Sequence, residues 1–71
     1  MEIKKSMKVK NNKGTYNATY RVFNIFDRWI AKMIIENEVY DVVESKKFIE
    51  RDNAIMDMYD KLTVKGFHIA K

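Results

Sequence analysis

Two alternating runs of residues, separated by a short turn, constrain the fold of this chain more than any other feature. Apolar and polar residues alternate from Ile3 to Val9, with Lys5 as an interruption of the apolar face, and again from Tyr16 to Val22. This period of two is typical of a strand that buries one face. The Asn-Asn-Lys-Gly segment at 11–14 has the composition of a turn, because Asn tolerates and Gly favours a positive φ angle. The sequence therefore predicts a β-hairpin from Ile3 to Val22.

Residues 25–44 fit two different patterns. As strands, apolar residues alternate through 29–35, and a short turn leads into a second strand over 39–43. As a helix, residues 25–36 carry an apolar stripe, and Asn24 is a suitable N-cap. β-branched and aromatic residues dominate this segment, and one hairpin alone would support a long helix poorly, so we favour the strands.

An amphipathic helix is predicted from Ser45 to Gly66. Ser45 can cap its first turn through the side-chain hydroxyl, and Gly66 can take the positive φ angle that ends a helix. Phe67 would then fold back onto Leu62. The apolar residues follow the spacing of one buried stripe, and they are Phe48, Ile49, Ile55, Met56, Tyr59 and Leu62.

The chain has the length and composition of one small packed domain. A chain of 71 residues buries only about 60% of its unfolded surface, too little for two cores. We therefore predict a single domain over residues 1–71, of the α+β class. It would be an antiparallel β-meander of three to four strands packed against one C-terminal amphipathic helix. The alternative is a ββαβα order, with residues 25–36 helical.

From the sequence we expect neither a membrane span nor a signal peptide. It has no apolar run of 18 residues and no charged segment leading into an apolar one at its start. We therefore expect a cytoplasmic protein. It has no cysteine, which excludes disulfides and thiolate metal sites.

Positive charge is concentrated in the first half of the chain. Residues 1–32 contain eight basic and two acidic side chains, a net charge of +6, whereas residues 33–71 contain six basic and eight acidic ones, a net charge of −2. The whole chain therefore carries +4. A basic region of this kind attracts polyanions or an acidic protein surface.

The basic residues are placed where they could contact phosphates. Those of the hairpin alternate onto the outward face of the predicted sheet, which could follow a phosphate backbone. Two more start the predicted helix, where unpaired backbone N–H groups and the helix macrodipole attract anions. The predicted nucleic-acid-binding residues are Lys4, Lys8, Lys10, Lys13, Arg21, Lys32, Lys46 and Lys47.

Aromatic residues could add stacking contacts to the bases of a single strand where they are exposed. Phe23 and Phe26 are the better exposed candidates. The other aromatic residues at alternating positions are expected in the core, namely Tyr16, Tyr20, Trp29 and Tyr40.

About half of the chain resembles known nucleic-acid-binding domains. The segment from Trp29 to Leu62, with Ser45-Lys46-Lys47 at the predicted helix start and Ala54 midway, resembles the strand–strand–helix half of double-stranded RNA-binding domains. Its layout is also similar to the N-terminal DNA-binding domains of the AP2 and phage-integrase families. The first resemblance implies phosphate contacts for the lysine pair at the helix start.

The sequence offers little for catalysis or metal binding. His68 is the only histidine, and no glycine-rich phosphate loop is present. The carboxylates between residues 36 and 44 lack the spacing and the glycine of a calcium loop. We therefore expect no enzymatic activity, no metal and no cofactor.

Two functions agree with these features. The first is a small non-enzymatic accessory protein that binds DNA or RNA through the basic hairpin face and the helix start. The second is an inhibitor or adaptor from a phage or mobile element, of the anti-CRISPR or anti-restriction type, that binds an anionic surface of a host protein. Neither function requires a membrane, and both are compatible with a homodimer.

Overall fold

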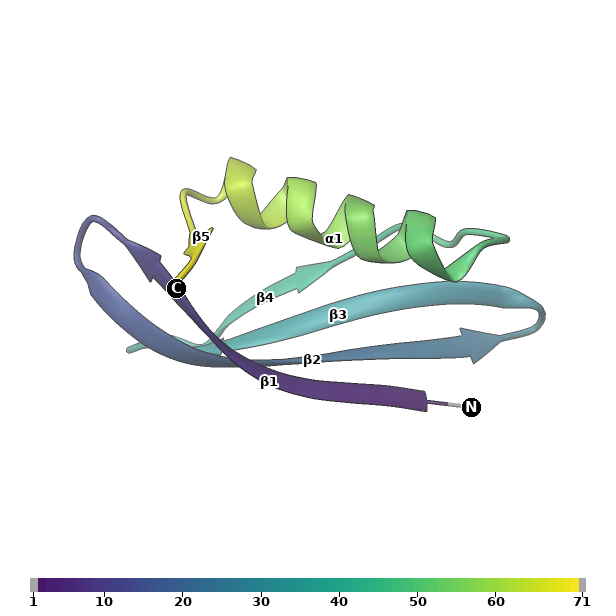
Figure 1. Ribbon diagram of the computed structural model, residues 1–71, viewed down its shortest axis with the longest axis horizontal. Helices are drawn as coiled ribbons and strands as arrows, with labels where there is room; N and C mark the ends of the chain where they lie inside the picture. Colours follow the sequence, from purple (N-terminus) through teal and green to yellow (C-terminus); the bar gives the residue numbers. More distant parts are fainter. Residues whose placement is uncertain (1, 71) are drawn as a thin grey trace.

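An antiparallel sheet carries a helix on one of its faces (Figure 1). The computed structural model describes residues 2–70, and within them five strands follow the order β4-β3-β2-β1-β5. This arrangement confirms the predicted α+β fold, a strand meander packed on a C-terminal helix. The elements are β1 (Glu2–Asn11), β2 (Gly14–Ile25), β3 (Arg28–Glu36), β4 (Asp41–Glu44), α1 (Arg51–Val64) and β5 (His68–Ile69).

The first predicted hairpin is present, and a side chain closes its turn. β1 and β2 pair from Glu2 opposite Phe23 to Asn11 opposite Gly14. The Asn11 side-chain oxygen accepts hydrogen bonds from the backbone N–H groups of Lys13 at 2.9 Å and of Gly14 at 3.1 Å. Asn11 therefore acts through its side chain as an Asx turn, and its own φ angle is not positive.

The segment that fitted two patterns forms strands. β3 pairs antiparallel with β2, which confirms the strand prediction for 29–35 and shows that the helical alternative for 25–36 is wrong. Phe26 and Asp27 form the connecting turn, with φ angles of 50° and 61°. Positive φ at both central residues defines a type I′ turn, whose usual residues are Asn and Gly. No glycine marks this turn, so it was not predicted.

β4 starts two residues later than the predicted strand over 39–43. The Asn37 side-chain oxygen accepts the backbone N–H groups of Val39 at 3.3 Å and of Asp41 at 3.2 Å. These hydrogen bonds fold the chain into a loop before β4. In this loop Tyr40 has a φ angle of 49°, in the left-handed region.

Beyond β4 the chain stays beside β3 and contains a β-bulge. Lys32 lies opposite Glu44, whereas Trp29 lies opposite Phe48. Residues 30 and 31 of β3 therefore lie opposite the three residues 45–47 of the neighbouring segment. One extra residue on one side of a strand pair defines a β-bulge. The backbone N–H and carbonyl groups of Trp29 both bond to those of Phe48, at 2.6 and 3.0 Å.

Ser45 stabilises this bulge instead of capping a helix. Its hydroxyl accepts the Ala31 N–H at 2.9 Å and donates to the Lys46 carbonyl at 2.7 Å. Its own N–H donates to the Ala31 carbonyl at 2.8 Å. Because these bonds hold the chain extended along β3, α1 begins only at Arg51. The prediction that the helix starts at Ser45 is therefore wrong.

The later start also changes which helix face is buried. α1 packs mainly against β3 and β4 and buries residues that are four positions apart, namely Ala54, Met58 and Leu62. Ile49 and Met56, predicted in the buried stripe, are 72% and 63% exposed. Ile49 precedes the helix. Met56 lies two residues from both Ala54 and Met58, and two residues correspond to about 200° around a helix, so it faces solvent.

The helix ends as predicted, and the chain then returns to the sheet. Gly66 has a φ angle of 92° and donates to the Thr63 carbonyl, while the Phe67 N–H donates to that of Leu62. These two bonds form a Schellman motif, and Phe67 is buried beside Leu62 in the core. β5, which was not predicted, follows directly.

β5 covers only two residues of the outer edge of β1. From Glu2 to Met7, this edge has no neighbouring strand within residues 2–70. Lys5 lies in this open stretch, opposite the buried Tyr20 and therefore on the face that carries the helix.

Candidate nucleic-acid interface

Three basic residues form one row across the outward face of the sheet. Lys4 pairs with Arg21, and Arg21 pairs with Lys32, so the three occupy equivalent positions on adjacent strands. Their sequence neighbours Val22 and Met33 are fully buried on the other face, under the helix. We call Lys4, Arg21 and Lys32 the cation row.

The cation row does not stabilise the sheet. Like charges directly opposite each other on neighbouring strands are destabilising. Glu44 continues the row beside Lys32, but no carboxylate within residues 2–70 approaches the three cations to 4.0 Å. The ion pairs of this part of the chain are Arg51–Asp52 and Lys61–Asp57. Fold stability therefore gives no reason for the like-charged Lys4–Arg21 and Arg21–Lys32 pairs.

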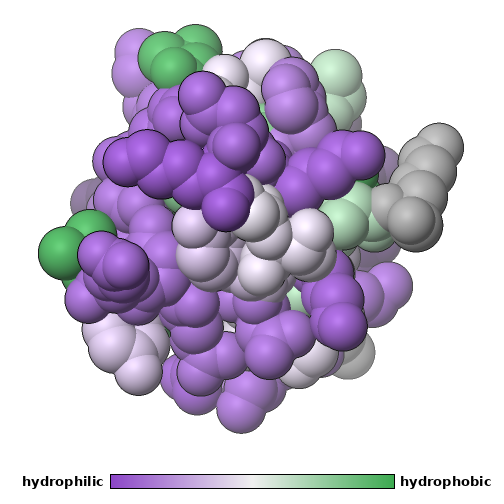
Figure 2. Space-filling model, turned by 90° about the vertical axis from the view of Figure 1, so that its left-hand side faces the viewer, coloured by the Kyte–Doolittle hydropathy of each residue, from purple (hydrophilic) through white to green (hydrophobic). Residues whose placement is uncertain are grey.

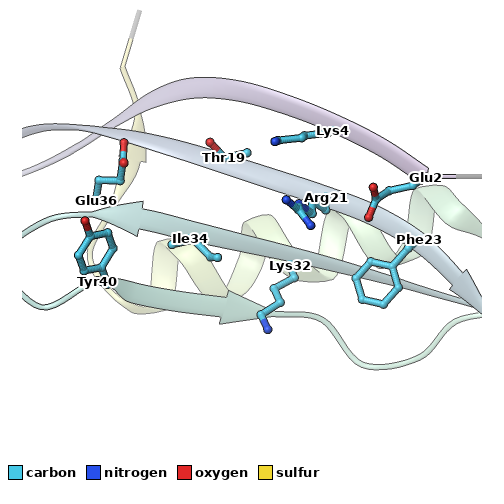
Figure 3. Close-up of a pocket in the computed structure, with 9 residues that line it drawn as sticks. All are labelled: Glu2, Lys4, Thr19, Arg21, Phe23, Lys32, Ile34, Glu36 and Tyr40. Carbon is cyan, nitrogen blue, oxygen red and sulfur yellow. The ribbon is translucent and has the colours of Figure 1, made fainter.

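The cation row crosses a hollow of about 590 Å³ on the outward face (Figure 3). Phe23 lies at one end of the hollow and Tyr40 at the other, and the cations lie between them. The hollow therefore offers both charge and apolar surface to a ligand. Its remaining lining residues are Thr19, Ile34, Glu2 and Glu36.

Two further predicted residues extend this basic surface along β1. Lys8 lies opposite Asn17, and Lys10 lies opposite Thr15, both on the outward face and exposed. Lys13 is exposed in the turn that follows β1. The structure thus brings the predicted basic residues of the first three strands to one face and its end.

Lys46 and Lys47 do not start a helix, so the predicted anion site at a helix N-terminus is wrong. α1 begins at Arg51, and its first turn contains the acidic Asp52. Phe48 pairs with β3 and packs against the core. Its neighbour Lys47 is exposed.

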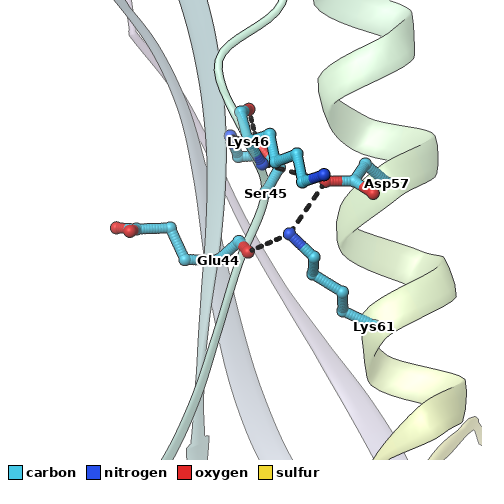
Figure 4. Close-up of polar contacts among 6 residues, drawn as sticks. Glu44, Ser45, Lys46, Asp57 and Lys61 are labelled. Atoms are coloured by element: carbon cyan, nitrogen blue, oxygen red, sulfur yellow. Dashed lines mark hydrogen bonds and ion pairs between the residues drawn. The ribbon is translucent and has the colours of Figure 1, made fainter.

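The backbone of Lys46 instead connects the bulge to the helix (Figure 4). Its N–H donates to the Asp57 carboxylate at 2.9 Å, and the Lys61 ammonium lies 3.1 Å from the same oxygen. Lys61 also donates to the Glu44 carbonyl at 3.2 Å. The Lys46 hydrogen bond, supported by Lys61, holds the pKa of Asp57 below its usual 3.8. These contacts give Asp57 and Lys61 a structural role.

The aromatic residues are placed largely as predicted. Phe26 is 94% exposed, and Phe23 is half-buried at the edge of the hollow. Tyr40 was predicted in the core, but its side chain is 63% exposed. It lies in the loop that the Asn37 side chain forms before β4, and not in a strand. The remaining three belong to the core or pack against it, namely Tyr16, Tyr20 and Trp29.

Exposed apolar side chains occur at both ends of the molecule. The end with the turn at 11–14 is mostly hydrophilic, with isolated hydrophobic side chains (Figure 2). At the other end, the β2–β3 turn and the segment before α1 lie together (Figure 1). Exposed Ile25 and Phe26 belong to this turn, and exposed Ile49 belongs to this segment. We call these three residues the apolar tip.

Other kinds of site find no support in the part of the chain that the structure describes. Within residues 2–70, no three His, Asp or Glu side chains are grouped to hold a metal ion. No helix in this range has both the length and the apolar character needed to cross a membrane.

No protein-family model matches the chain, and no curated protein or solved structure resembles it significantly.

Proposed function

We propose that this protein is a small, non-enzymatic accessory protein of the cytoplasm that binds nucleic acid through the outward face of its sheet. The cation row is the observation that carries this proposal. Three cations side by side without a carboxylate within ion-pairing distance, among the described residues, weaken the fold. A bound polyanion would remove that repulsion.

The expected binding mode follows from the chemistry of phosphate contacts. Each lysine or arginine that touches a phosphate displaces about one condensed counterion, so affinity falls linearly with salt on a double-logarithmic plot. Phosphates are the same in every sequence, so the cation row supplies affinity without base specificity. Lys8 and Lys10 extend the same surface and would add to this effect.

The salt dependence of binding tests the proposal. Fluorescence anisotropy with labelled DNA and RNA should show linear salt plots for the wild type, and Arg21→Gln or Lys32→Gln should each reduce the slope by about one. Arg51→Gln is the matched control, because Arg51 is exposed at the start of α1, on the other face of the sheet. Absence of binding at low salt, where electrostatic attraction is strongest, would refute the proposal.

The apolar tip favours a second candidate, an inhibitor or adaptor that binds a host protein. Exposed aromatic side chains are frequent anchors of protein interfaces, and Phe26 is held in a turn conformation that suits Asn or Gly better. Co-purification from a native lysate, with and without nuclease, separates the two candidates. A stoichiometric protein partner that survives nuclease and is lost in Phe26→Asn supports the second; retained nucleic acid supports the first.

A further inference from the structure

We infer that the outward face binds a single strand of nucleic acid, with phosphates on the cation row and bases in the hollow. This inference rests on the proposed function and adds the class of nucleic acid. It follows from what lies on each side of the cation row, and from the backbone conformation of one residue that lines the hollow.

The cation row has the length of a short stretch of one nucleic-acid strand. Neighbouring β-strands are about 4.8 Å apart, so the backbones of Lys4 and Lys32 are about 10 Å apart across β2. In a duplex, each strand advances about 3.4 Å along the helix axis per phosphate. Successive phosphates of one strand lie farther apart than this rise, so the row could accept about two phosphates of a strand that runs across the sheet.

Apolar groups lie on both sides of this path. Phe23 lies two residues along β2 from Arg21. Ile34 lies two residues along β3 from Lys32, and it is 42% exposed. Tyr40 closes the hollow beyond Ile34 (Figure 3). Bases of a single strand would project onto these groups and stack on the two aromatic rings. A duplex keeps its base faces stacked inside and would leave this apolar surface in water.

The backbone of Tyr40 points to the same use of the hollow. A bulky residue with a φ angle of 49° is a conformational outlier, since Asn or Gly takes this conformation at lower cost. The Tyr40 side chain is also largely exposed, so burial in the core does not compensate for this cost. Strained residues of this kind concentrate at ligand sites. Contact with a bound base gives the ring a role that the unbound fold does not.

Affinity for matched single-stranded and duplex probes tests the inference. The single-stranded probes are an oligothymidylate and an oligouridylate of about 12 nucleotides, within the span of small single-strand-binding domains. The duplex probe is a DNA hairpin whose stem has as many base pairs as these probes have nucleotides. The variants are Tyr40→Asn, which suits the left-handed backbone, and Phe23→Leu. Phe26→Leu is the control, because it removes an exposed aromatic ring outside the hollow.

The inference requires tighter binding of the single strands than of the hairpin. Tyr40→Asn and Phe23→Leu should each weaken single-strand binding by roughly five- to hundredfold, the effect of losing one stacked base. The salt slope should stay unchanged, because no charge is lost, and Tyr40→Asn should melt no earlier than the wild type. Preference between thymidylate and uridylate distinguishes DNA from RNA as the ligand.

Two other results would overturn the inference. Equal or tighter binding of the hairpin, with no effect of Tyr40→Asn or Phe23→Leu, would leave a duplex-binding protein, and the proposed function would stand alone. No binding of any probe at low salt would refute both, and the apolar tip would then be the surface to test with protein partners. Because Tyr40 is exposed and its substitution relieves strain, a folding defect cannot account for a loss of binding in that variant.

Discussion

Asp57 and Lys46 are eleven residues apart in the sequence, yet the Asp57 carboxylate accepts the backbone N–H of Lys46 at 2.9 Å. This hydrogen bond joins the middle of α1 to the segment that follows β4. It satisfies a donor that would be one of the unpaired N–H groups of the first turn if the helix began at Ser45. The contact therefore stabilises the extended course of the chain before the helix.

Asp57→Asn should destabilise the protein by about 1 kcal/mol, because a charge-assisted hydrogen bond and an ion pair are replaced by neutral contacts. The effect is modest, since the Asp57 side chain is 23% exposed and solvent screens its charge. Urea denaturation near neutral pH measures the difference. Asp60→Asn, an exposed carboxylate on the same helix, should change stability by less than about 0.5 kcal/mol.

The contribution of Asp57 should also depend on pH. Its folded-state pKa is lowered from 3.8, so the contribution is complete above the unfolded-state pKa and is lost as the pH falls through the folded-state pKa. The stability difference between wild type and Asp57→Asn should therefore shrink below about pH 4. A difference that stays constant down to about pH 2 would contradict this assignment.

Ser45→Ala should cost about 1–3 kcal/mol, because it leaves the Ala31 N–H without its acceptor in a buried position. Thermal and chemical denaturation measure this loss. Ser6→Ala is a suitable control, since Ser6 is exposed on β1. Equal effects of the two substitutions would show that the bulge does not depend on the Ser45 hydroxyl.

Leu62→Ala should destabilise the fold by about 2–5 kcal/mol, because Leu62 is almost fully buried and its loss leaves a cavity. Ile55→Ala should cost less, since Ile55 is only partly buried beside the core. Denaturant midpoints of the two variants give the comparison. A larger loss of stability in Ile55→Ala than in Leu62→Ala would mean that the buried face of the helix is centred one residue away from Ala54, Met58 and Leu62.

Phe26→Asn should raise stability by about 0.5–1 kcal/mol, because Asn fits a positive φ angle better and Phe26 buries almost no surface. The melting temperature of the variant tests this. A lower melting temperature would mean that the Phe26 ring stabilises the turn by contacts of its own.

Patterns confined to one element could be predicted from the sequence. The alternation around 11–14 predicted the hairpin, and a two-residue turn there also aligns Lys4 with Arg21. Gly66 and Phe67 predicted the helix end, because the Schellman motif depends on local residues. The outward basic face followed from the same alternation of period two.

Features that depend on contacts between elements were missed. The alignment of Arg21 with Lys32 depends on a turn at Phe26 and Asp27, which lacks the usual glycine. The helix start was misplaced because Ser45 has the composition of an N-cap, while its actual partner is Ala31 on another strand. The buried face of the helix differs from the predicted one for the same reason. Tyr40 was expected inside a strand, whereas it precedes β4 and lines the hollow.

Lys5 affects how this protein behaves in a crowded solution. An exposed strand edge such as that of β1 is a template for further strands, and a charge on its inner face is a common protection against such pairing. A second molecule added antiparallel with the two Lys5 residues opposite each other would bring two ammonium groups together. An apolar residue at position 5 would complete the apolar face of the edge strand without disturbing the fold. We therefore expect selection against aggregation, rather than selection for stability, to keep a charge at this position.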